Sequence, residues 1–391
     1  MTRRMRIAVL CRHFCATGGG AERYAVALVE HLAALHDIHV FAQQITHQWP
    51  GVTYHRVPHP FSRPRWVNQL WFATATWWAT RCGFDVVHSH EITWHGQVQT
   101  VHVLPVKYKL FDGLAGLARV MRWARVLASP RLLAYLCLEH LRFASVTRRI
   151  MVATSQQLVD QTLSVYPVCR DALRVVLPGI EQVQPVATPA QKSSARQVLG
   201  LPAGGHCVLW VGHDYLRKGL DTLIDALPLL PDNTYLALVG AGQPVQLLAC
   251  KQQAARLGVL QRVYFLGALQ DMTAAYTAAD CLAHPTREDT FAMVVLEAMA
   301  HGLPVVVSCD KFCGIAGLLQ HGRDALLLSN PLDADELARA LRQLVLDPDR
   351  VSSLQQASMA FASAHRWADL AQQQAQIYRD VAAGSAAPSG R

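Results

Sequence analysis

The chain has 391 residues, 51% of them hydrophobic, and a formal net charge of +8. This length and composition indicate a globular protein of about two domains. No window reaches about 18 uncharged apolar residues, which excludes a membrane-spanning helix, and the apolar part of the basic start is too short for a signal peptide. The ten cysteines are scattered without zinc-site spacing, so we expect reduced thiols, no metal site and a cytosolic protein.

Positive charge is concentrated in the first half of the chain. Residues 1–180 hold 20 Lys and Arg against 9 Asp and Glu, whereas residues 181–391 hold 16 against 19. Such an asymmetry indicates an anionic partner for the first half, either a nucleic acid or a membrane surface. An incidentally basic surface is the alternative.

Buried-strand patterns alternate with helical patterns along the first half. The first, Arg6–Arg12, is followed by a glycine loop and by a helical pattern that starts at Ala21. Further strand patterns lie at Ile38–Gln43, Val52–Val57, Phe84–His90, Gln99–Leu104, Ile150–Ser155 and Arg174–Gly179. This alternation predicts a parallel sheet covered on both faces.

Three glycines, Gly18–Gly20, separate the first strand from the first helix. Glycines at this place let backbone N–H groups approach an anion at a helix N-terminus. The dinucleotide-binding fingerprint fails because residue 23 is an arginine. A plain tight turn explains the glycines equally well.

Residues 107–149 form a basic amphipathic stretch. They combine Leu, Val, Met, Trp and Phe with at least eight cations and only two acids. This composition fits a helix at the surface of an anionic membrane, with Arg119, Arg122 and Arg125 as lipid contacts. A helix packed on its own sheet is the alternative.

A Pro- and Ser-rich stretch, Gln184–Ser194, is typical of a linker. A second series of strand patterns follows at Cys207–Gly212, Thr234–Gly240, Val263–Gly267, Cys281–Thr286, Leu303–Ser308 and Ala325–Ser329. We therefore expect two doubly wound α/β domains, residues 1–183 and 195–365, joined by the linker 184–194 and followed by a C-terminal helix and disordered tail at 366–391. Ligands of such sheets bind at the carboxyl ends of the strands.

Two cations follow the first strand of the second half. Arg217 and Lys218 lie between the strand that ends at Gly212 and an amphipathic helix. Arg as a planar fork and Lys as a point charge are well placed there for phosphates. A solvated charged turn is the alternative.

The segment REDTFAMVVLEAMAHGLPVVV places acids before and within a buried helix. Glu297 follows Asp289 by eight residues, about two helical turns, so the two carboxylates are expected on one face. They can accept hydrogen bonds from sugar hydroxyls, while free N–H groups at Phe291, Ala292 and Met293 can bind phosphate or carboxylate oxygens. N-capping by Asp289 is the alternative.

Together these motifs resemble the retaining GT-B glycosyltransferases of family 4, over nearly the whole chain. The matching pieces are GGGAER, VVHSHE, TVHV, LPGIE, VGHDYLRKGLDTLIDAL, LVGAG, VYFLG, YTAADCLAHPT with the acidic segment, and HRWADLAQQQAQIYRDV. Within the family the chain is similar to the lipopolysaccharide core glucosyltransferases. The resemblance implies two Rossmann-like domains facing across a cleft, an acceptor-side first domain and a nucleotide-sugar-binding second one, with the C-terminal helix crossing back to the first.

The resemblance also assigns roles to the motif residues. Arg217 and Lys218 are expected to bind the donor diphosphate, and Gly19 and Gly20 to flank it. Glu297 is expected to hold the ribose hydroxyls. The RKG block and the paired acids are specific to the family, whereas the glycine loop only supports the assignment.

Two positions depart from the family pattern. The first acid of the E-x7-E motif falls on Asp289, where the family usually has a Glu facing the donor sugar, so Glu288 is the alternative. His102 matches the family histidine near the reaction centre, although in the core glucosyltransferases the corresponding position resembles an Asp. A core histidine is the alternative for His102, and His88 and His90 are expected in strand-end packing or beside the acceptor.

The implied activity is transfer of a sugar, with retention, from a nucleotide sugar (expected to be a UDP-sugar) to lipopolysaccharide or another glycan or lipid-linked acceptor. No metal and no other cofactor are expected, because Arg217 and Lys218 supply the positive charge. The D-x-D matches at Asp333–Asp335 and Asp347–Asp349 are interpreted as helix-cap and turn acids. The expected location is the cytoplasmic face of the inner membrane, with no nucleic-acid partner.

Other function classes stay open. A nucleic-acid-binding protein fits the sequence pI of 9.1, but a recognition-helix motif and aromatic–basic interleaving on a sheet are missing. A sugar-nucleotide-binding protein without catalysis fits the departure at Asp289. Among enzymes, an epimerase or phosphorylase of GT-B type is the alternative, although no pyridoxal lysine can be placed.

Overall fold

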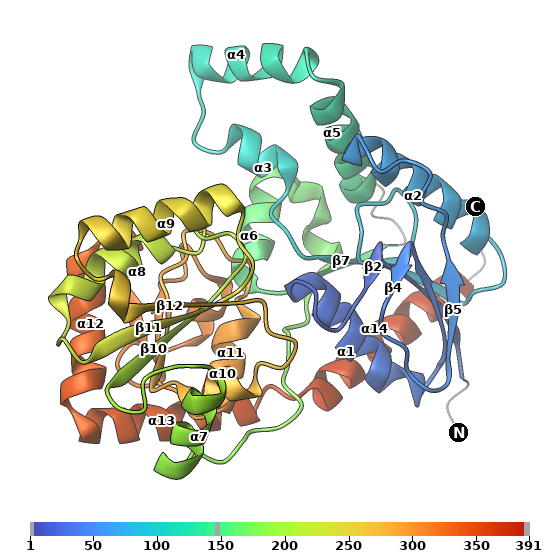
Figure 1. Ribbon diagram of the computed structural model, residues 1–391. Coiled ribbons are helices and arrows are strands. Elements are labelled where there is room, and N and C mark those ends of the chain that lie inside the picture. Colours follow the sequence, from blue (N-terminus) through green and yellow to red (C-terminus); the bar gives the residue numbers. More distant parts are fainter. Residues whose placement is uncertain (1–3, 145–148, 387–391) are drawn as a thin grey trace. The chain divides into compact units, whose positions relative to one another are not determined.

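The computed structural model describes residues 4–144 and 149–386 (Figure 1). The chain forms two compact units, residues 1–178 together with 367–391, and residues 179–366. Each unit is built on a parallel sheet, as the alternation of strand and helix patterns predicted.

The first unit holds a seven-stranded sheet in the order β5-β3-β1-β6-β7-β8-β9. Its strands are β1 (Arg6–Leu10), β3 (Asp37–Ala42), β5 (Val52–Arg56), β6 (Val86–Ser89), β7 (Val98–Val101), β8 (Ile150–Ala153) and β9 (Leu173–Val175), and β2 (His13–Phe14) pairs separately with β4 (Gln44–Ile45). The central strands β6 and β7 are buried at every residue. Such continuous burial is typical of parallel strands covered on both faces.

Helices cover both faces of this sheet. They are α1 (Gly20–Ala33), α2 (Arg65–Thr80), α3 (Val106–Phe111), α4 (Gly116–Leu127), α5 (Pro130–Ala144), α6 (Gln156–Val165), the 3₁₀ turn η1 (Pro167–Ala172) and α14 (Trp367–Ala386). α1 and α14 pack together on one face, and α2 and α5 pack together on the other (Figure 1). The C-terminal helix thus belongs to the first unit, as predicted. The predicted tail beyond it, residues 387–391, lies outside the described residues.

The second unit holds a six-stranded parallel sheet in the order β12-β11-β10-β13-β14-β15. Its strands are β10 (His206–Val211), β11 (Thr234–Val239), β12 (Val263–Gly267), β13 (Cys281–His284), β14 (Val305–Ser308) and β15 (Leu326–Leu328). The strand order reverses between β10 and β13. Because these two neighbouring strands are parallel, the loops that follow them leave the same edge of the sheet. Open α/β sheets bind their ligands at such a switch point.

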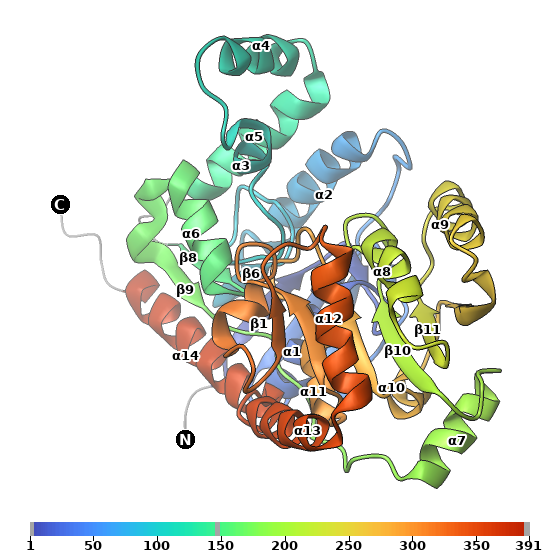
Figure 2. The same ribbon diagram turned by 90° about the vertical axis from the view of Figure 1, so that its left-hand side faces the viewer.

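The helices of the second unit also form two layers. They are α7 (Pro189–Val198), α8 (Leu220–Ala226), α9 (Pro244–Arg256), α10 (Thr273–Ala278), α11 (Met293–Ala300), α12 (Ala334–Leu346) and α13 (Pro348–Ser363), with 3₁₀ turns η2 (Leu227–Leu229), η3 (Leu260–Arg262) and η4 (Gly314–Leu318). α8 packs against α9 and α12, whereas α11 packs against α13 on the other face (Figure 2). α11 is apolar at every position except Glu297, because β13, β14 and α13 surround it.

Part of the predicted linker is a helix. Residues 189–194 belong to α7, whose first residue is Pro189. Thr188 and Gln191 form a capping box, in which each side chain accepts a hydrogen bond from the other residue's backbone N–H. Proline fits the first turn of a helix because the missing N–H has no partner there in any case. The Pro- and Ser-rich composition therefore marked a helix start rather than a flexible segment.

The two D-x-D matches are helix caps, as interpreted from the sequence. The Asp333 carboxylate accepts from the backbone N–H of Glu336 at the start of α12, and Asp347 accepts from Arg350 at the start of α13. Within residues 4–144 and 149–386, no three or more His, Cys, Asp or Glu side chains are grouped to hold a metal ion. In the same residues, no helix is long and apolar enough to span a bilayer.

Candidate active site

The loop between β10 and α8 carries Arg217 and Lys218. Gly219 ends it in a left-handed conformation (φ = 71°) at the N-cap of α8. A Cβ at Gly219 would lie 1.8 Å from the carbonyl oxygen of Pro285, so only glycine allows this approach. The buried Trp210 donates its indole N–H to the carbonyl oxygen of Lys218 at 3.0 Å. Both contacts fix the backbone from which the two cations project.

The loop between β13 and α11 lies directly against this first loop. The backbone N–H of Arg287 donates to the carbonyl oxygen of Arg217 at 2.8 Å, and the buried hydroxyl of Thr286 donates to the same oxygen at 3.2 Å. On its other side, Asp289 exchanges backbone hydrogen bonds with Phe312 and Gly314. The acidic loop is therefore held on both sides by backbone contacts.

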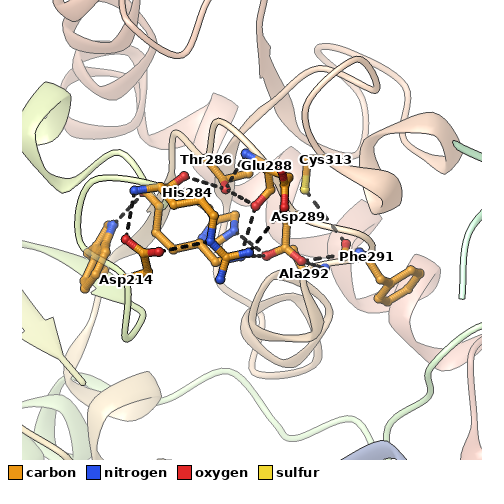
Figure 3. A network of polar contacts seen from close by, with 11 residues as sticks. Asp214, His284, Thr286, Glu288, Asp289, Phe291, Ala292 and Cys313 are labelled. Atoms are coloured by element: carbon orange, nitrogen blue, oxygen red, sulfur yellow. Dashed lines mark hydrogen bonds and ion pairs between the residues drawn. The ribbon is translucent and has the colours of Figure 1, made fainter. Parts of the chain in front are cut away.

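Lys218, Asp289 and His284 meet at the centre of the site. Figure 3 shows His284 and Asp289 within this network of polar contacts. The Lys218 ammonium forms an ion pair with Oδ2 of Asp289. Nε2 of His284, at the end of β13, lies 3.1 Å from the same oxygen. These side chains are 13%, 16% and 1% exposed, respectively. Lys218, which was predicted to bind phosphate, and Asp289, which was predicted to bind the sugar, are thus partners of one another in this structure.

The protonation state of Asp289 follows from these contacts. Burial alone would raise the pKa of its carboxyl group, but the Lys218 charge and the His284 hydrogen bond outweigh burial and hold the pKa well below its usual range. Burial lowers the pKa of His284, and Lys218 and Arg217 lower it further, against the opposing effect of Asp289. Asp289 is therefore a carboxylate at neutral pH and His284 a neutral imidazole.

The predicted helical register of Asp289 is wrong. α11 begins at Met293, and its N-cap Ala292 has φ = 70°, the one positive φ outside glycine among the described residues. The separation of eight positions from Asp289 to Glu297 consequently does not correspond to two helical turns. The N–H groups of Phe291 and Ala292 are not free either, because they donate to Oδ1 of Asp289 at 3.3 and 2.9 Å.

Glu288 points to a different partner from Asp289. Its carboxylate lies 3.7 Å from the Arg217 guanidinium, which also contacts Asp214 at 3.3 Å. Arg217 is 45% exposed and Glu288 31% exposed, so this pair is solvated and weak. Of the two candidate acids, Asp289 is the less exposed one, and four hydrogen-bond donors fix its geometry.

Glu297 lies in the second turn of α11 and is half-buried. Its Oε2 accepts a hydrogen bond of 2.7 Å from the hydroxyl of the buried Tyr276 in α10. This partner lowers the cost of placing a carboxylate in an apolar helix. Tyr276 had not been singled out from the sequence.

The glycine loop belongs to the first unit. Gly19 is the N-cap of α1 with φ = −69°, and Gly20 is the first helical residue. A Cβ at Gly18 would lie 2.9 Å from the Cβ of Glu22, and one at Gly19 would lie 2.9 Å from its carboxylate. The approach to the Glu22 Cβ accounts for a glycine at position 18. At position 19 the near atom is the movable end of the Glu22 side chain, so the contact does not require glycine there.

His102 follows β7 in the first unit and is part of a stack of imidazoles. Its Nε2 lies 2.9 Å from Nδ1 of His90, and its ring contacts the edge of Tyr24. Nδ1 of the fully buried His88 lies 2.6 Å from the hydroxyl of Tyr378 in α14. His88 is thus a packing residue, one of the two roles expected for it.

Burial determines the charge of this stack. It lowers the pKa of His90 to about 3, with a further contribution from the charge of Arg142. Burial, His90 and Arg142 likewise hold the pKa of His102 well below its usual range. The imidazoles are therefore neutral at pH 7, a state in which each can donate one hydrogen bond and accept another.

Sequence reasoning missed His284, although a signal was present. The strand CLAHP is otherwise apolar, and a buried polar side chain is costly unless it has a partner. The same argument identified Glu297 and would have indicated a partner for His284. Tyr378 carried no such signal, since its contact with His88 joins residues 290 positions apart.

Two family models match the chain. The model described as Glycosyltransferase Family 4 matches residues 18–183, and the model described as Glycosyl transferases group 1 matches residues 205–347. The first match includes the glycine loop and His102. The second includes Arg217, Lys218 and both acids.

Curated relatives match over shorter stretches. The chain is 30% identical over 201 residues to the lipopolysaccharide glucosyltransferase WaaG of Escherichia coli (strain K12), which covers 50% of this chain and 52% of WaaG. It is 29% identical over 221 residues to the D-inositol 3-phosphate glycosyltransferase of Corynebacterium urealyticum. This match covers 54% of this chain and 51% of that relative. The chain spans about half the length of the curated relatives it matches.

Solved structures match over nearly the full length. The crystal structure of WaaG, a glycosyltransferase involved in lipopolysaccharide biosynthesis, is similar with a TM-score of 0.81 at 22% identity, covering 95% of this chain and 99% of that chain. Anabaena Alr3699/HepE in complex with UDP-glucose is similar with a TM-score of 0.74 at 21% identity, covering 96% and 100%. From its two family matches and this architecture, the chain belongs to the family 4 glycosyltransferases and has the GT-B fold.

Proposed function

We propose that this protein is a retaining hexosyltransferase that moves a sugar from a nucleotide sugar to a glycan or lipid-linked acceptor. The observation that carries the proposal is the group of Lys218, Asp289 and His284 at the switch point of the second sheet, with Arg217 beside it. Cations for a diphosphate and a fixed carboxylate for a sugar lie side by side there. A protein that bound only a nucleotide would need the cations but not the carboxylate.

The donor is proposed to be a UDP-sugar. Arg217 and Lys218 bind the diphosphate, Glu297 the ribose hydroxyls, and Asp289 a hydroxyl of the transferred sugar. Support comes from the burial and fixed position of Asp289, and from the UDP-glucose in the similar HepE structure. Between the two acids, these contacts favour Asp289 over Glu288.

The chemistry proposed is a front-face displacement at the anomeric carbon. The acceptor oxygen forms the new bond on the face that the leaving diphosphate vacates, and the acceptor proton passes to a phosphate oxygen. Negative charge develops on the diphosphate, where Arg217 and Lys218 stabilise it through preorganised electrostatics. We expect the reaction to need no metal and no further cofactor, because these two cations carry out that task.

The acceptor is proposed to be lipopolysaccharide or another membrane-borne glycan at the cytoplasmic face of the inner membrane. α4 supports a membrane contact because Val126 is its one buried residue. Its exposed apolar residues are Leu117, Val120, Met121, Trp123 and Leu127. A helix packed on its own sheet would bury such a set, whereas an interfacial helix inserts it between lipid head groups, next to Arg119, Arg122 and Arg125.

α2 offers a second surface of the same kind. Its outer side carries Trp71, Trp77 and Trp78, which are 37%, 41% and 60% exposed, and the Arg81 guanidinium lies 3.7 Å from the Trp78 ring. Residues 38–84 contain no Asp or Glu. Tryptophan is favoured at membrane interfaces, and a surface without acids suits an anionic leaflet.

A donor panel tests the activity. The full chain is incubated with UDP-, GDP- and ADP-sugars, and nucleoside diphosphate release is measured with and without glycan acceptors. We expect release from one UDP-sugar, faster with acceptor present. Binding without turnover of any donor would favour the non-catalytic alternative, and the absence of both binding and turnover would refute the proposal.

Vesicle flotation tests the membrane contact. Replacing Arg119, Arg122 and Arg125 by Gln should weaken binding to vesicles that contain phosphatidylglycerol, by about 1 kcal/mol per cation. The matched control replaces Arg339, Arg350 and Arg379, which lie on other helices, and should bind like the unchanged chain. Equal binding of both variants would show that α4 is not the contact.

A further inference from the structure

The Asp289 carboxylate is fully occupied by donors from the protein. Oδ1 accepts from the N–H groups of Phe291 and Ala292, and Oδ2 accepts from Lys218 and His284. A carboxylate has about four lone-pair sites, so these four donors fill them. A sugar hydroxyl can therefore bind Asp289 well only if one donor turns away.

The four donors differ in how easily they can leave. The two N–H groups belong to the turn that leads into α11, and their positions are fixed by the backbone. His284 is 1% exposed at the end of β13 and has no room to rotate. Lys218 has a flexible stem with three N–H donors, and its ammonium also lies 3.4 Å from the carbonyl oxygen of Glu288. Lys218 is thus the exchangeable donor and His284 the permanent one.

The tautomer of His284 agrees with a permanent donor. Its Nδ1 is buried and has no hydrogen-bond partner within the described residues, whereas Nε2 faces the Asp289 carboxylate. A neutral imidazole carries one N–H, and a proton on Nδ1 would leave a donor unsatisfied and two acceptors facing each other. The proton therefore resides on Nε2.

We propose that His284 is the positioning residue of the donor-sugar site: it holds Oδ2 of Asp289 in place while the Lys218 ammonium turns from Asp289 to the donor diphosphate. This inference rests on the proposed function, since it deepens the roles of the same site. Its consequence is coupling. The diphosphate draws Lys218 away and so opens a coordination position on Asp289 for the sugar, which makes sugar recognition dependent on the diphosphate.

Two variants separate positioning from mere packing. His284→Leu keeps the apolar bulk and removes the donor, whereas His284→Gln retains an N–H at about the place of Nε2. We measure by calorimetry the Kd of UDP and of UDP-glucose for the full chain. The unchanged chain and H284Q should bind UDP-glucose more tightly than UDP. H284L should keep its affinity for UDP and lose roughly 10-fold of that preference, the effect of one hydrogen bond to a charged group.

The outcomes distinguish the inference from the function beneath it. An H284L chain that retains the unchanged preference for UDP-glucose overturns the positioning role and leaves the donor site intact. An unchanged chain that binds neither UDP nor UDP-glucose refutes the proposed donor, and the inference with it.

A measurement that does not need H284L covers the case in which that variant does not fold. In protein labelled with ¹⁵N-histidine, the resonance that disappears in H284Q belongs to His284, and its ¹⁵N shifts report the tautomer. We expect the proton on Nε2. In Lys218→Met, which needs no donor to be tested, the pKa of His284 should rise because the Lys218 charge lowers it. A proton on Nδ1, or a His284 pKa unchanged in K218M, contradicts the inference.

Discussion

The two units hold their buried polar side chains in opposite ways. In the second unit, Lys218 and Asp289 form a charged pair on the loops that follow the neighbouring strands β10 and β13, and the neutral His284 at the end of β13 supports the pair. In the first unit, His88, His90 and His102 stack as neutral rings on strand ends. The charged group is held by the attraction between Lys218 and Asp289, whereas the histidines are neutral rings held by burial and hydrogen bonds.

This difference also determines how each region depends on its partners. A buried charge that loses its partner is strongly unfavourable, whereas a neutral imidazole that loses one hydrogen bond costs less. The second unit should therefore respond most to removal of a single side chain, and the first unit most to a change of pH.

Removal of Lys218 should have the largest effect on stability. Lys218→Met leaves the buried Asp289 carboxylate without its counter-ion, so we expect a loss of about 3–5 kcal/mol in the free energy of unfolding at pH 7. The matched control is Lys192→Met, because Asp280 keeps Arg196 as a second partner, and this change should cost at most about 1 kcal/mol. Urea denaturation of both variants checks the comparison. Equal losses in the free energy of unfolding would show that the Lys218–Asp289 pair contributes no more to stability than a surface ion pair.

Acid should act on the histidine stack. Its folded-state pKa values lie below that of an unfolded histidine, so below about pH 6.5 the unfolded chain binds more protons and stability falls with pH. For each histidine that stays neutral in the folded state, the free energy of unfolding falls by about 2 kcal/mol between pH 6.5 and 5. Asp289 affects stability at lower pH. Because its pKa is depressed in the folded chain, its contribution to the free energy of unfolding is complete above about pH 4 and is lost on further acidification.

The histidine assignment can be checked by the slope of stability against pH. In His90→Gln, the fall in the free energy of unfolding between pH 6.5 and 5 should be smaller by the contribution of one histidine. In His59→Gln, at an exposed position, this fall should match that of the unchanged chain. Identical slopes for all three proteins would mean that the stack does not remain neutral in acid.

The smallest expected effect is a gain. Ala292 adopts a left-handed conformation that alanine disfavours, so Ala292→Gly should raise the free energy of unfolding by about 1 kcal/mol. The control Ala79→Gly, at an exposed position of α2, should lower it by about 1 kcal/mol. Thermal unfolding measures both. A292G less stable than the unchanged chain would indicate that Ala292 packing outweighs its backbone strain.

How much of the structure could be predicted from the sequence depends on how far apart along the chain the contacting residues are. The strands and the RKG loop follow from local patterns, because Gly219, which caps α8, is next to Lys218 in the sequence. The return of the C-terminal helix to the first unit was implied by the family resemblance and not by a local pattern. The register of the acids did not follow, because it assumed continuous helix and Ala292 interrupts it. Residues 189–194 of the predicted linker belong to α7, because proline and serine also suit a helix start, here at Pro189. The contact of His88 with Tyr378 joins distant parts of the chain that no local pattern relates.

The most direct test of the central claim compares Asp289→Asn with Glu288→Gln in donor turnover. D289N keeps the shape of the side chain and removes its charge, so turnover of the UDP-sugar should fall by roughly 10²-fold or more. E288Q should stay within a few-fold of the unchanged chain, because the Glu288 side chain is 31% exposed and its pair with Arg217 is solvated. If E288Q abolishes turnover while D289N retains it, the buried carboxylate is not the sugar ligand and the account of the site is wrong.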